Sequence, residues 1–118
     1  MSLKIEITDK PPQNLEEILE SLFWKEPELV KTAEDFLQYI KEWDRTETPY
    51  TVDQWKQYTL KKNITQSSYH NMLKRLKRAG MIEKKYNQGR KKHELHLKKE
   101  FSEVLYKMYS IWDEYTRS

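Results

Sequence analysis

The sequence predicts one mostly helical α+β domain. Its 118 residues fit a single compact domain of ordinary size. Apolar residues recur at helical spacing in five segments, whereas only residues 81–86 and 93–97 have the pattern of a β-hairpin. The chain has no cysteine and only two glycines. This composition excludes thiolate zinc sites and cysteine nucleophiles, and it disfavours glycine-rich nucleotide-binding loops.

Two amphipathic helices are predicted in the first part of the chain. The first begins after Asn14, which with Glu17 has the spacing of a capping box, and ends near Trp24. The second runs from Pro27 to about Arg45, since proline is tolerated at the first helical position. Both apolar stripes are expected to face the core. Residues 1–10 contain a weak signal for a short strand.

Two short helices joined by a tight turn follow Pro49. A capping box at residues 51–54 opens the first, which extends to about Lys62. After a three-residue turn, Thr65 caps a second helix over residues 66–79, and Gly80 is placed to end it. This spacing is that of a helix-turn-helix. The hairpin comes next, with a basic loop over residues 87–92.

Charge is divided unevenly along the chain. Residues 1–48 carry a net charge of −6, residues 49–99 carry +11, and residues 100–118 carry −2. Clustered lysines and arginines favour a polyanion partner, because neutralising phosphates releases counterions. A solvated basic face that binds nothing is the alternative, and the pattern within the block decides between them.

The stretch ITQSSYHNMLKRLKRAGMIEK, residues 64–84, resembles the recognition helix and first wing strand of winged helix-turn-helix proteins. It is similar to the MarR-like and related bacterial and archaeal transcription regulators, over roughly residues 50–99. The resemblance implies a DNA-binding winged domain. Tyr69 departs from the pattern, since a smaller aliphatic residue is usual there, and the acidic helices before residue 49 match no particular family.

A helical wheel divides residues 66–79 into two faces. Tyr69, Met72, Leu73, Leu76 and Ala79 form the apolar face. DNA recognition needs polar side chains that reach base edges and cations that hold phosphates. We expect base contacts from Ser67, His70, Asn71 and Lys74, with Ser68 flanking them and with Arg75 and Arg78 on the phosphate backbone. An ordinary amphipathic helix with a hydrated basic side is the alternative.

The hairpin loop is expected to form the wing tip. Its cations, Arg90, Lys91 and Lys92, would contact the backbone or the minor groove. His93 and His96 are three apart on a strand and therefore point to opposite faces, so no metal site is expected. No set of nucleophile, base and orienting group is recognisable. We therefore expect neither catalysis nor a cofactor.

A long helix is predicted over residues 100–117. Its apolar side chains cover an arc of about 160° on the wheel, which is wide for a terminal helix. We expect this stripe to form an isologous dimer interface through Phe101, Leu105, Met108, Trp112 and Tyr115. Coverage of the stripe by the two N-terminal helices of the same chain is the alternative.

These observations predict three segments: an acidic helical extension at residues 1–48, a winged helix-turn-helix at 49–99 and a dimerisation helix at 100–118. The expected function is sequence-specific binding of double-stranded DNA by a homodimer that regulates transcription. The alternatives are a replication or plasmid-maintenance protein and a winged module that binds protein. No apolar run is long enough to span a bilayer and no signal peptide is recognisable, so we expect a cytoplasmic protein without membrane contact. No small-molecule effector is indicated.

Overall fold

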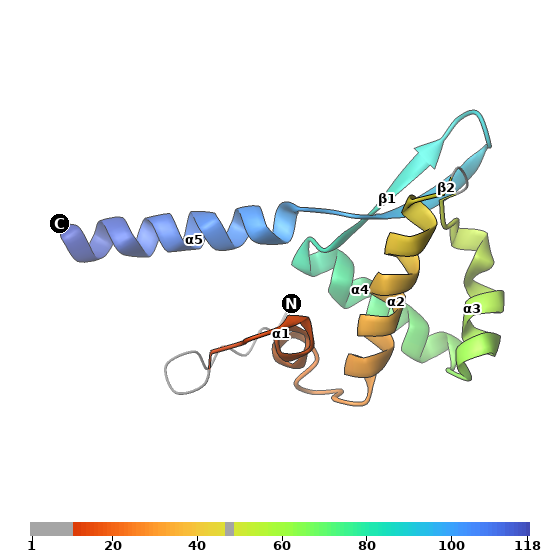
Figure 1. Ribbon diagram of the computed structural model, residues 1–118, viewed down its shortest axis with the longest axis horizontal. Coiled ribbons are helices and arrows are strands. Elements are labelled where there is room, and N and C mark those ends of the chain that lie inside the picture. Colours follow the sequence, from red (N-terminus) through yellow and green to blue (C-terminus); the bar gives the residue numbers. More distant parts are fainter. Residues whose placement is uncertain (1–10, 47–48) are drawn as a thin grey trace.

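A computed structural model describes residues 11–46 and 49–118. Within them the chain is mostly helical α+β, with one two-stranded antiparallel hairpin and five α-helices, of which the last is long and C-terminal. The strand predicted within residues 1–10 lies outside the described residues. Figure 1 shows α1 to α4 grouped beneath the hairpin, with the last helix projecting to one side.

The first two helices are α1 (Leu15–Leu22) and α2 (Leu29–Asp44). Asn14 caps α1, because its side chain accepts a 2.9 Å hydrogen bond from the Glu17 backbone N–H. The predicted capping box is only half formed, since the Glu17 carboxylate accepts from the Gln13 backbone instead (3.3 Å). Helix α2 begins two residues later than predicted, after a turn closed by bonds to the carbonyls of Glu26 and Pro27.

The segment predicted to be a helix-turn-helix begins with the 3₁₀ turn η1 (Val52–Gln54), which continues into α3 (Trp55–Lys62). The predicted capping box is present here, and the Thr51 N–H donates to the Gln54 side chain at 2.8 Å. Asn63 ends α3 in the left-handed conformation (φ 55°), which asparagine tolerates better than most residues. Thr65 then caps α4 (Gln66–Ala79), as predicted, through a 3.0 Å bond from the Ser68 N–H.

Gly80 is required by both its conformation and its surroundings. It ends α4 with φ +81°, and a Cβ at this position would lie 3.1 Å from the Glu100 Cβ. The Phe101 N–H donates to the Gly80 carbonyl at 3.0 Å. Gly80 therefore ends α4 and also contacts the first turn of the C-terminal helix.

The hairpin consists of β1 (Ile82–Asn87) and β2 (Lys92–Leu97). Ile82 pairs with Leu97, and Asn87 pairs with Lys92. The connecting loop is shorter than predicted, because the Asn87 side chain accepts a 3.1 Å bond from the Arg90 N–H and Lys91 adopts a left-handed conformation. The wing is tied to the body where the Leu95 N–H donates to the Tyr50 carbonyl (3.0 Å).

The core is rich in tyrosine. Phe36 from α2 lies at its centre, with the rings of Tyr50, Tyr58 and Tyr69 packed edge-on at centroid distances of 5.0 to 5.7 Å. The hydroxyls of Tyr50 and Tyr69 share a 2.7 Å hydrogen bond, and the Tyr58 hydroxyl donates to Asp35 at 2.9 Å. Tyr69 stands where a smaller aliphatic residue is usual in the proteins that this segment resembles, and its ring packs edge-on against Phe36 of α2.

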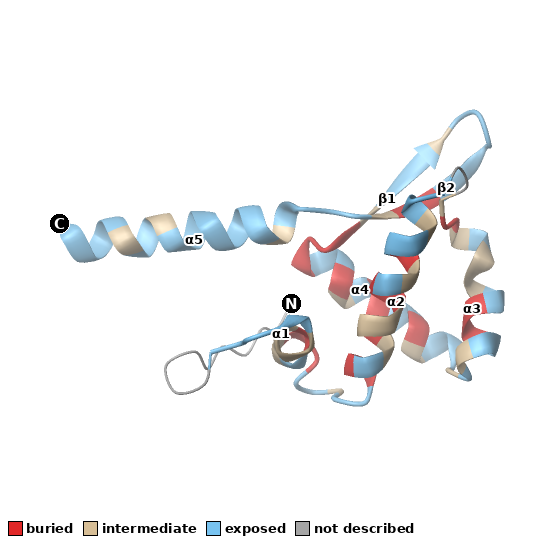
Figure 2. Cartoon of the chain, viewed as in Figure 1, coloured by how far each residue is buried: buried red, intermediate tan, exposed pale blue. Residues whose placement is uncertain are grey.

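The last helix, α5 (Glu100–Arg117), extends away from this body (Figure 1). Figure 2 shows that nearly all of it is exposed, whereas buried residues concentrate where α2, α3 and α4 meet. The radius of gyration is 16.1 Å, compared with about 13 to 14 Å for a compact chain of this length. The projecting helix accounts for the excess.

Candidate nucleic-acid interface

Helix α4 presents one buried and one exposed face. The side chains of Tyr69, Met72, Leu73, Leu76 and Ala79 are buried, as predicted. The opposite face exposes Ser67, His70, Asn71, Lys74 and Arg78. This face is polar near the start of the helix and cationic towards its end, which is the order that contacts first to bases and then to phosphates would need.

His70 is partly held in place by its neighbours. Its ring lies 5.5 Å from the Tyr69 ring and 6.2 Å from the Trp55 ring, measured between centroids. A side-chain hydrogen bond of 3.5 Å joins it to Gln66. His70 therefore presents one edge outward from the junction of α3 and α4.

Arg75 lies elsewhere than predicted. Its guanidinium donates to the Glu26 carboxylate at 2.9 Å and to the Leu22 carbonyl at 3.3 Å, and it covers the Phe23 ring. Only 20% of the Arg75 side chain is exposed. We therefore correct its predicted placement on the phosphate-contacting face, because Arg75 fastens α4 to the α1–α2 turn.

Ser68 is also engaged within the protein. It is half-buried, its N–H donates to the Thr65 hydroxyl, and its own hydroxyl accepts from Thr65 at 3.0 Å. Its role in the structure is to close the N-terminal cap of α4. Ser67, one residue earlier, is exposed.

The three wing cations differ in their contacts. Arg90 lies 3.5 Å from the Glu94 carboxylate, and Lys92 lies 3.1 Å from the Asp53 carboxylate. Lys91, at the tip, is exposed and has a left-handed backbone with φ 56°. Arg90 is thus paired within the hairpin and Lys92 is paired with η1 of the body, while Lys91 is exposed at the tip.

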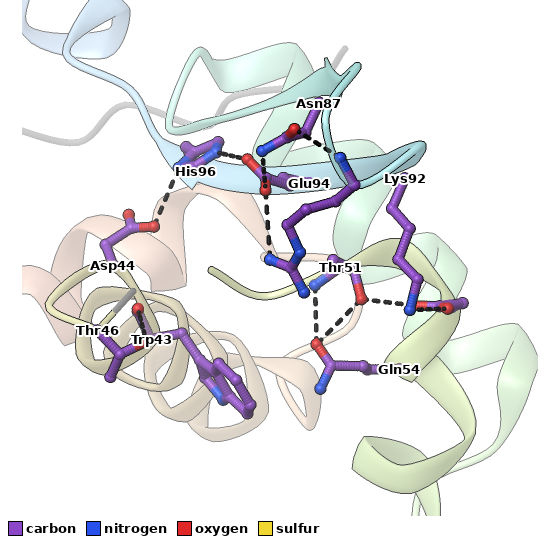
Figure 3. A network of polar contacts seen from close by, with 11 residues as sticks. Trp43, Asp44, Thr46, Thr51, Gln54, Asn87, Lys92, Glu94 and His96 are labelled. Carbon is purple, nitrogen blue, oxygen red and sulfur yellow. Dashed lines mark hydrogen bonds and ion pairs between the residues drawn. The ribbon is translucent and has the colours of Figure 1, made fainter. Parts of the chain in front are cut away.

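A buried carboxylate organises the wing (Figure 3). Glu94 accepts hydrogen bonds from Asn87 (2.9 Å) and Arg90 (3.5 Å), and His96 Nε2 lies 2.9 Å from its other oxygen. The contact with His96 contributes most to lowering the pKa of Glu94, with Asn87 and Arg90 adding to it. Ionised Glu94 therefore fixes both strands and the loop.

His96 connects this cluster to α2, since its Nδ1 lies 3.0 Å from the Asp44 carboxylate (Figure 3). His96 therefore has two acidic neighbours, Glu94 on its own strand and Asp44 at the end of α2. His96 and Asp44 are separated by 52 positions, so no local spacing could have indicated this pair. His93 packs on the Tyr86 ring at 4.9 Å, which places the two histidines on opposite faces of the hairpin, as predicted.

Asp53 is a second acidic residue that the sequence did not single out. Besides the contact with Lys92, it accepts a short hydrogen bond from the Thr51 hydroxyl. The bond from Thr51 is the main cause of its lowered pKa, and Lys92 adds to it. Asp53 therefore joins the loop end of the hairpin, at the start of β2, to η1.

Positive charge is crowded where α4 meets β1. Partial burial lowers the pKa of Lys77, and the nearby charge of Lys84 lowers it further. Both side chains are exposed. An anion placed beside them would relieve their mutual repulsion.

The predicted dimer residues on α5 separate into two groups. Leu105, Met108, Trp112 and Tyr115 are 42% to 69% exposed. Phe101 is half-buried and packs against the core of its own chain. In the described part of the chain, α1 and α2 do not cover the stripe beyond the first turn of α5, and the stripe remains open to solvent (Figure 2).

Among residues 11–46 and 49–118, no helix is both long and apolar enough to cross a membrane. Those residues also contain no group of three or more histidine, aspartate or glutamate side chains arranged to hold a metal ion.

These features define a small, mostly helical α+β protein in which the basic helix α4 is followed directly by a basic hairpin. The chain belongs to an archaeal protein family, whose model matches residues 11–116. Among the described elements, the match includes α1 to α4, both strands and all of α5 except its last residue. No curated protein and no solved structure matches the chain.

Proposed function

We propose that this protein is a winged helix-turn-helix protein that binds specific sequences of double-stranded DNA as a homodimer and regulates transcription. The observation that carries the proposal is the exposed face of α4, which follows a tight turn and is followed at once by a basic hairpin. A major groove admits one α-helix, and the side chains near its N-terminus reach base edges.

The structure suggests how the roles divide. Ser67, His70, Asn71 and Lys74 are exposed along α4 and would contact base edges. Asn71 is the sharpest candidate, because an asparagine amide can make two hydrogen bonds to adenine.

Phosphate contacts would come from Arg78, Lys77 and Lys84 beside α4 and from Lys91 at the wing tip, all of which are exposed. Arg90 and Lys92 would contribute after exchanging their carboxylate partners for phosphate. Homodimer formation through α5 would supply two recognition helices for one site.

Selection of bound sequences from a random duplex pool tests this function. We expect a palindromic motif with half-site centres about 10 base pairs apart, or a multiple of that spacing. Sites recovered from genomic DNA should lie at promoters, whereas sites confined to an origin would favour a replication role. A pool that yields no motif would contradict specific recognition.

The Asn71→Ala variant tests the base-reading face. We expect a loss of about 1–3 kcal/mol on the selected site and little change on random DNA, because a base contact is lost but no phosphate contact. Gln13→Ala, at an exposed amide just before α1 and outside every surface assigned to binding, is the matched control and should leave both affinities unchanged. Equal losses on both duplexes would exclude Asn71 from base reading.

A further inference from the structure

The apolar stripe of α5 continues onto the body of the protein. A groove runs beside the first turn of α5, between α1, α2 and the end of β2, and Leu15, Ile18, Leu37, Leu97 and Phe101 contribute apolar side chains to its lining. Phe101 belongs to both surfaces, since it lines the groove and begins the stripe. Groove and stripe therefore form one continuous apolar surface.

Helix α5 needs a partner for physical reasons. Beyond its first turn it has no buried residue, and large apolar side chains are exposed along its length. Most helical stability in proteins comes from packing of an apolar face rather than from intrinsic propensity, and α5 has no such packing beyond its first turn. Phe101, Val104, Met108, Ile111 and Tyr115 alternate spacings of three and four residues, which is the repeat of a two-helix coiled coil.

We propose that a second copy of this chain supplies that partner in an antiparallel arrangement, in which the C-terminal half of its α5 lies in the groove. This inference rests on the homodimer of the proposed function and specifies its geometry. Met108 is seven residues from both Phe101 and Tyr115, so a two-fold axis at Met108 would place Tyr115 of one copy against Phe101 of the other. Trp112 and Tyr115 would then cover the mouth of the groove.

The charges at the two ends are complementary. Lysines outnumber carboxylates in the groove lining, where Lys31, Lys41, Lys98 and Lys99 face Glu34 and Asp35. The last turns of α5 carry a net negative charge, from Asp113 and Glu114 against Arg117. The antiparallel arrangement brings this acidic end of α5 to the net basic groove. A parallel pair would place Phe101 against Phe101 and would leave the groove without a partner helix.

Chemical cross-linking tests the arrangement, because the chain has no cysteine of its own. Gln38 is exposed and lines the groove, and Thr116 is exposed at the far end of α5. The double variant Gln38→Cys/Thr116→Cys, treated with a short bismaleimide in the absence of DNA, should yield a covalent dimer. Each single variant, and the control Lys56→Cys/Thr116→Cys with its thiol on α3, should remain monomeric on a denaturing gel.

Three results would overturn the proposal. A covalent dimer of the Thr116→Cys single variant would indicate parallel helices. A link within one chain of the double variant would mean that α5 folds onto its own body. No link in the double variant would mean that α5 does not reach the groove.

The duplex selection is independent of this test. A sequence motif obtained without the predicted cross-link would support DNA recognition and contradict the antiparallel arrangement of α5. The predicted cross-link obtained without a sequence motif would support the antiparallel dimer and contradict specific DNA recognition.

Discussion

At the scale of single residues, Arg75 shows how side chains of one type on one helix can have different tasks. Arg75 and Arg78 are three positions apart, yet Arg75 is bound to Glu26 and Leu22 while Arg78 is exposed. The wheel placed Arg75 at the edge of the polar face. Only the position of the α1–α2 turn, 49 residues earlier, determines that it faces inward.

Replacing Arg75 should therefore destabilise the fold. We expect Arg75→Ala to lower the free energy of unfolding by about 1–3 kcal/mol, since it leaves the Glu26 carboxylate and the Leu22 carbonyl without their donor. Lys74→Ala, at the exposed neighbouring position, should change it by less than about 0.5 kcal/mol. Urea denaturation followed by circular dichroism measures both. A similar, small effect of the two substitutions would contradict the anchoring role.

Glu94 makes the free energy of unfolding depend on pH, and the fold is expected to lose stability as the pH falls. Its pKa is lowered in the folded protein, mainly by His96, so the unfolded chain binds more protons in the acid range. The stabilisation is present above the pKa of an unfolded glutamate, about 4.3, and is lost as the pH falls through the lower folded value. Urea denaturation over a pH series should show this loss in the wild type.

Two variants separate Glu94 from the other carboxylates. Glu94→Gln should flatten the acid dependence, because no proton is taken up at this position. Asn87→Ala removes one donor to Glu94 and should flatten it less. If Glu94→Gln retained the full wild-type slope, the acid dependence would arise elsewhere.

At the scale of the elements, local signals predicted most of the fold. Thr65 and Gly80 mark the two ends of α4, as predicted. Thr51 and Gln54 form the predicted capping box at the start of η1. These features depend on residues within four positions of one another, so spacing alone is informative. The contact of His96 with Asp44 and that of Lys92 with Asp53 join separate elements. No sequence period indicates such contacts.

The candidate site was predictable to the same extent as the fold. The division of α4 into a buried and an exposed face follows from helical periodicity, so Asn71, Lys74 and Arg78 were placed outward correctly. The wing cations were found from charge and turn signals. Whether Arg75 and Lys92 are free or paired depends on residues distant in the sequence, which is why their pairing with Glu26 and Asp53 was not foreseen. The pair of Arg90 with Glu94 is local, but it depends on the geometry of the hairpin loop.

Gly80 lies at the junction of α4 and α5, and Gly89 in the hairpin loop provides a matched control. Gly80→Ala should destabilise the fold by about 1–2 kcal/mol, because a side chain is disfavoured at φ +81°. The added Cβ would also lie only 3.1 Å from the Glu100 Cβ. Gly89→Ala, where φ is not positive and the nearest atom is 3.4 Å away, should be nearly neutral. Equal unfolding free energies for the two variants in urea would contradict the capping role of Gly80.

At the scale of the whole molecule, the residues that form the core and those proposed to form the dimer interface lie in different parts of the chain. The body has its own core around Phe36, while Trp112 is 66% exposed and lies on the part of α5 beyond that core. The structure thus favours an interface role for Trp112 over a place in the core of the single chain. Large apolar side chains at the centre of an interface contribute most of the association energy.

Trp112→Glu should therefore yield a folded monomer. A charge in the proposed apolar seam would be desolvated without a partner, which is strongly unfavourable, whereas the same charge on the monomer surface is hydrated. We expect light scattering at micromolar concentration to show a dimer for the wild type and a monomer for the variant, with circular dichroism near that of the wild type. Binding to the selected DNA site should weaken greatly, because each monomer would contribute only one recognition helix to the two half-sites. A wild type that is monomeric throughout would refute the interface, and a variant that unfolds would place Trp112 in the core of the single chain.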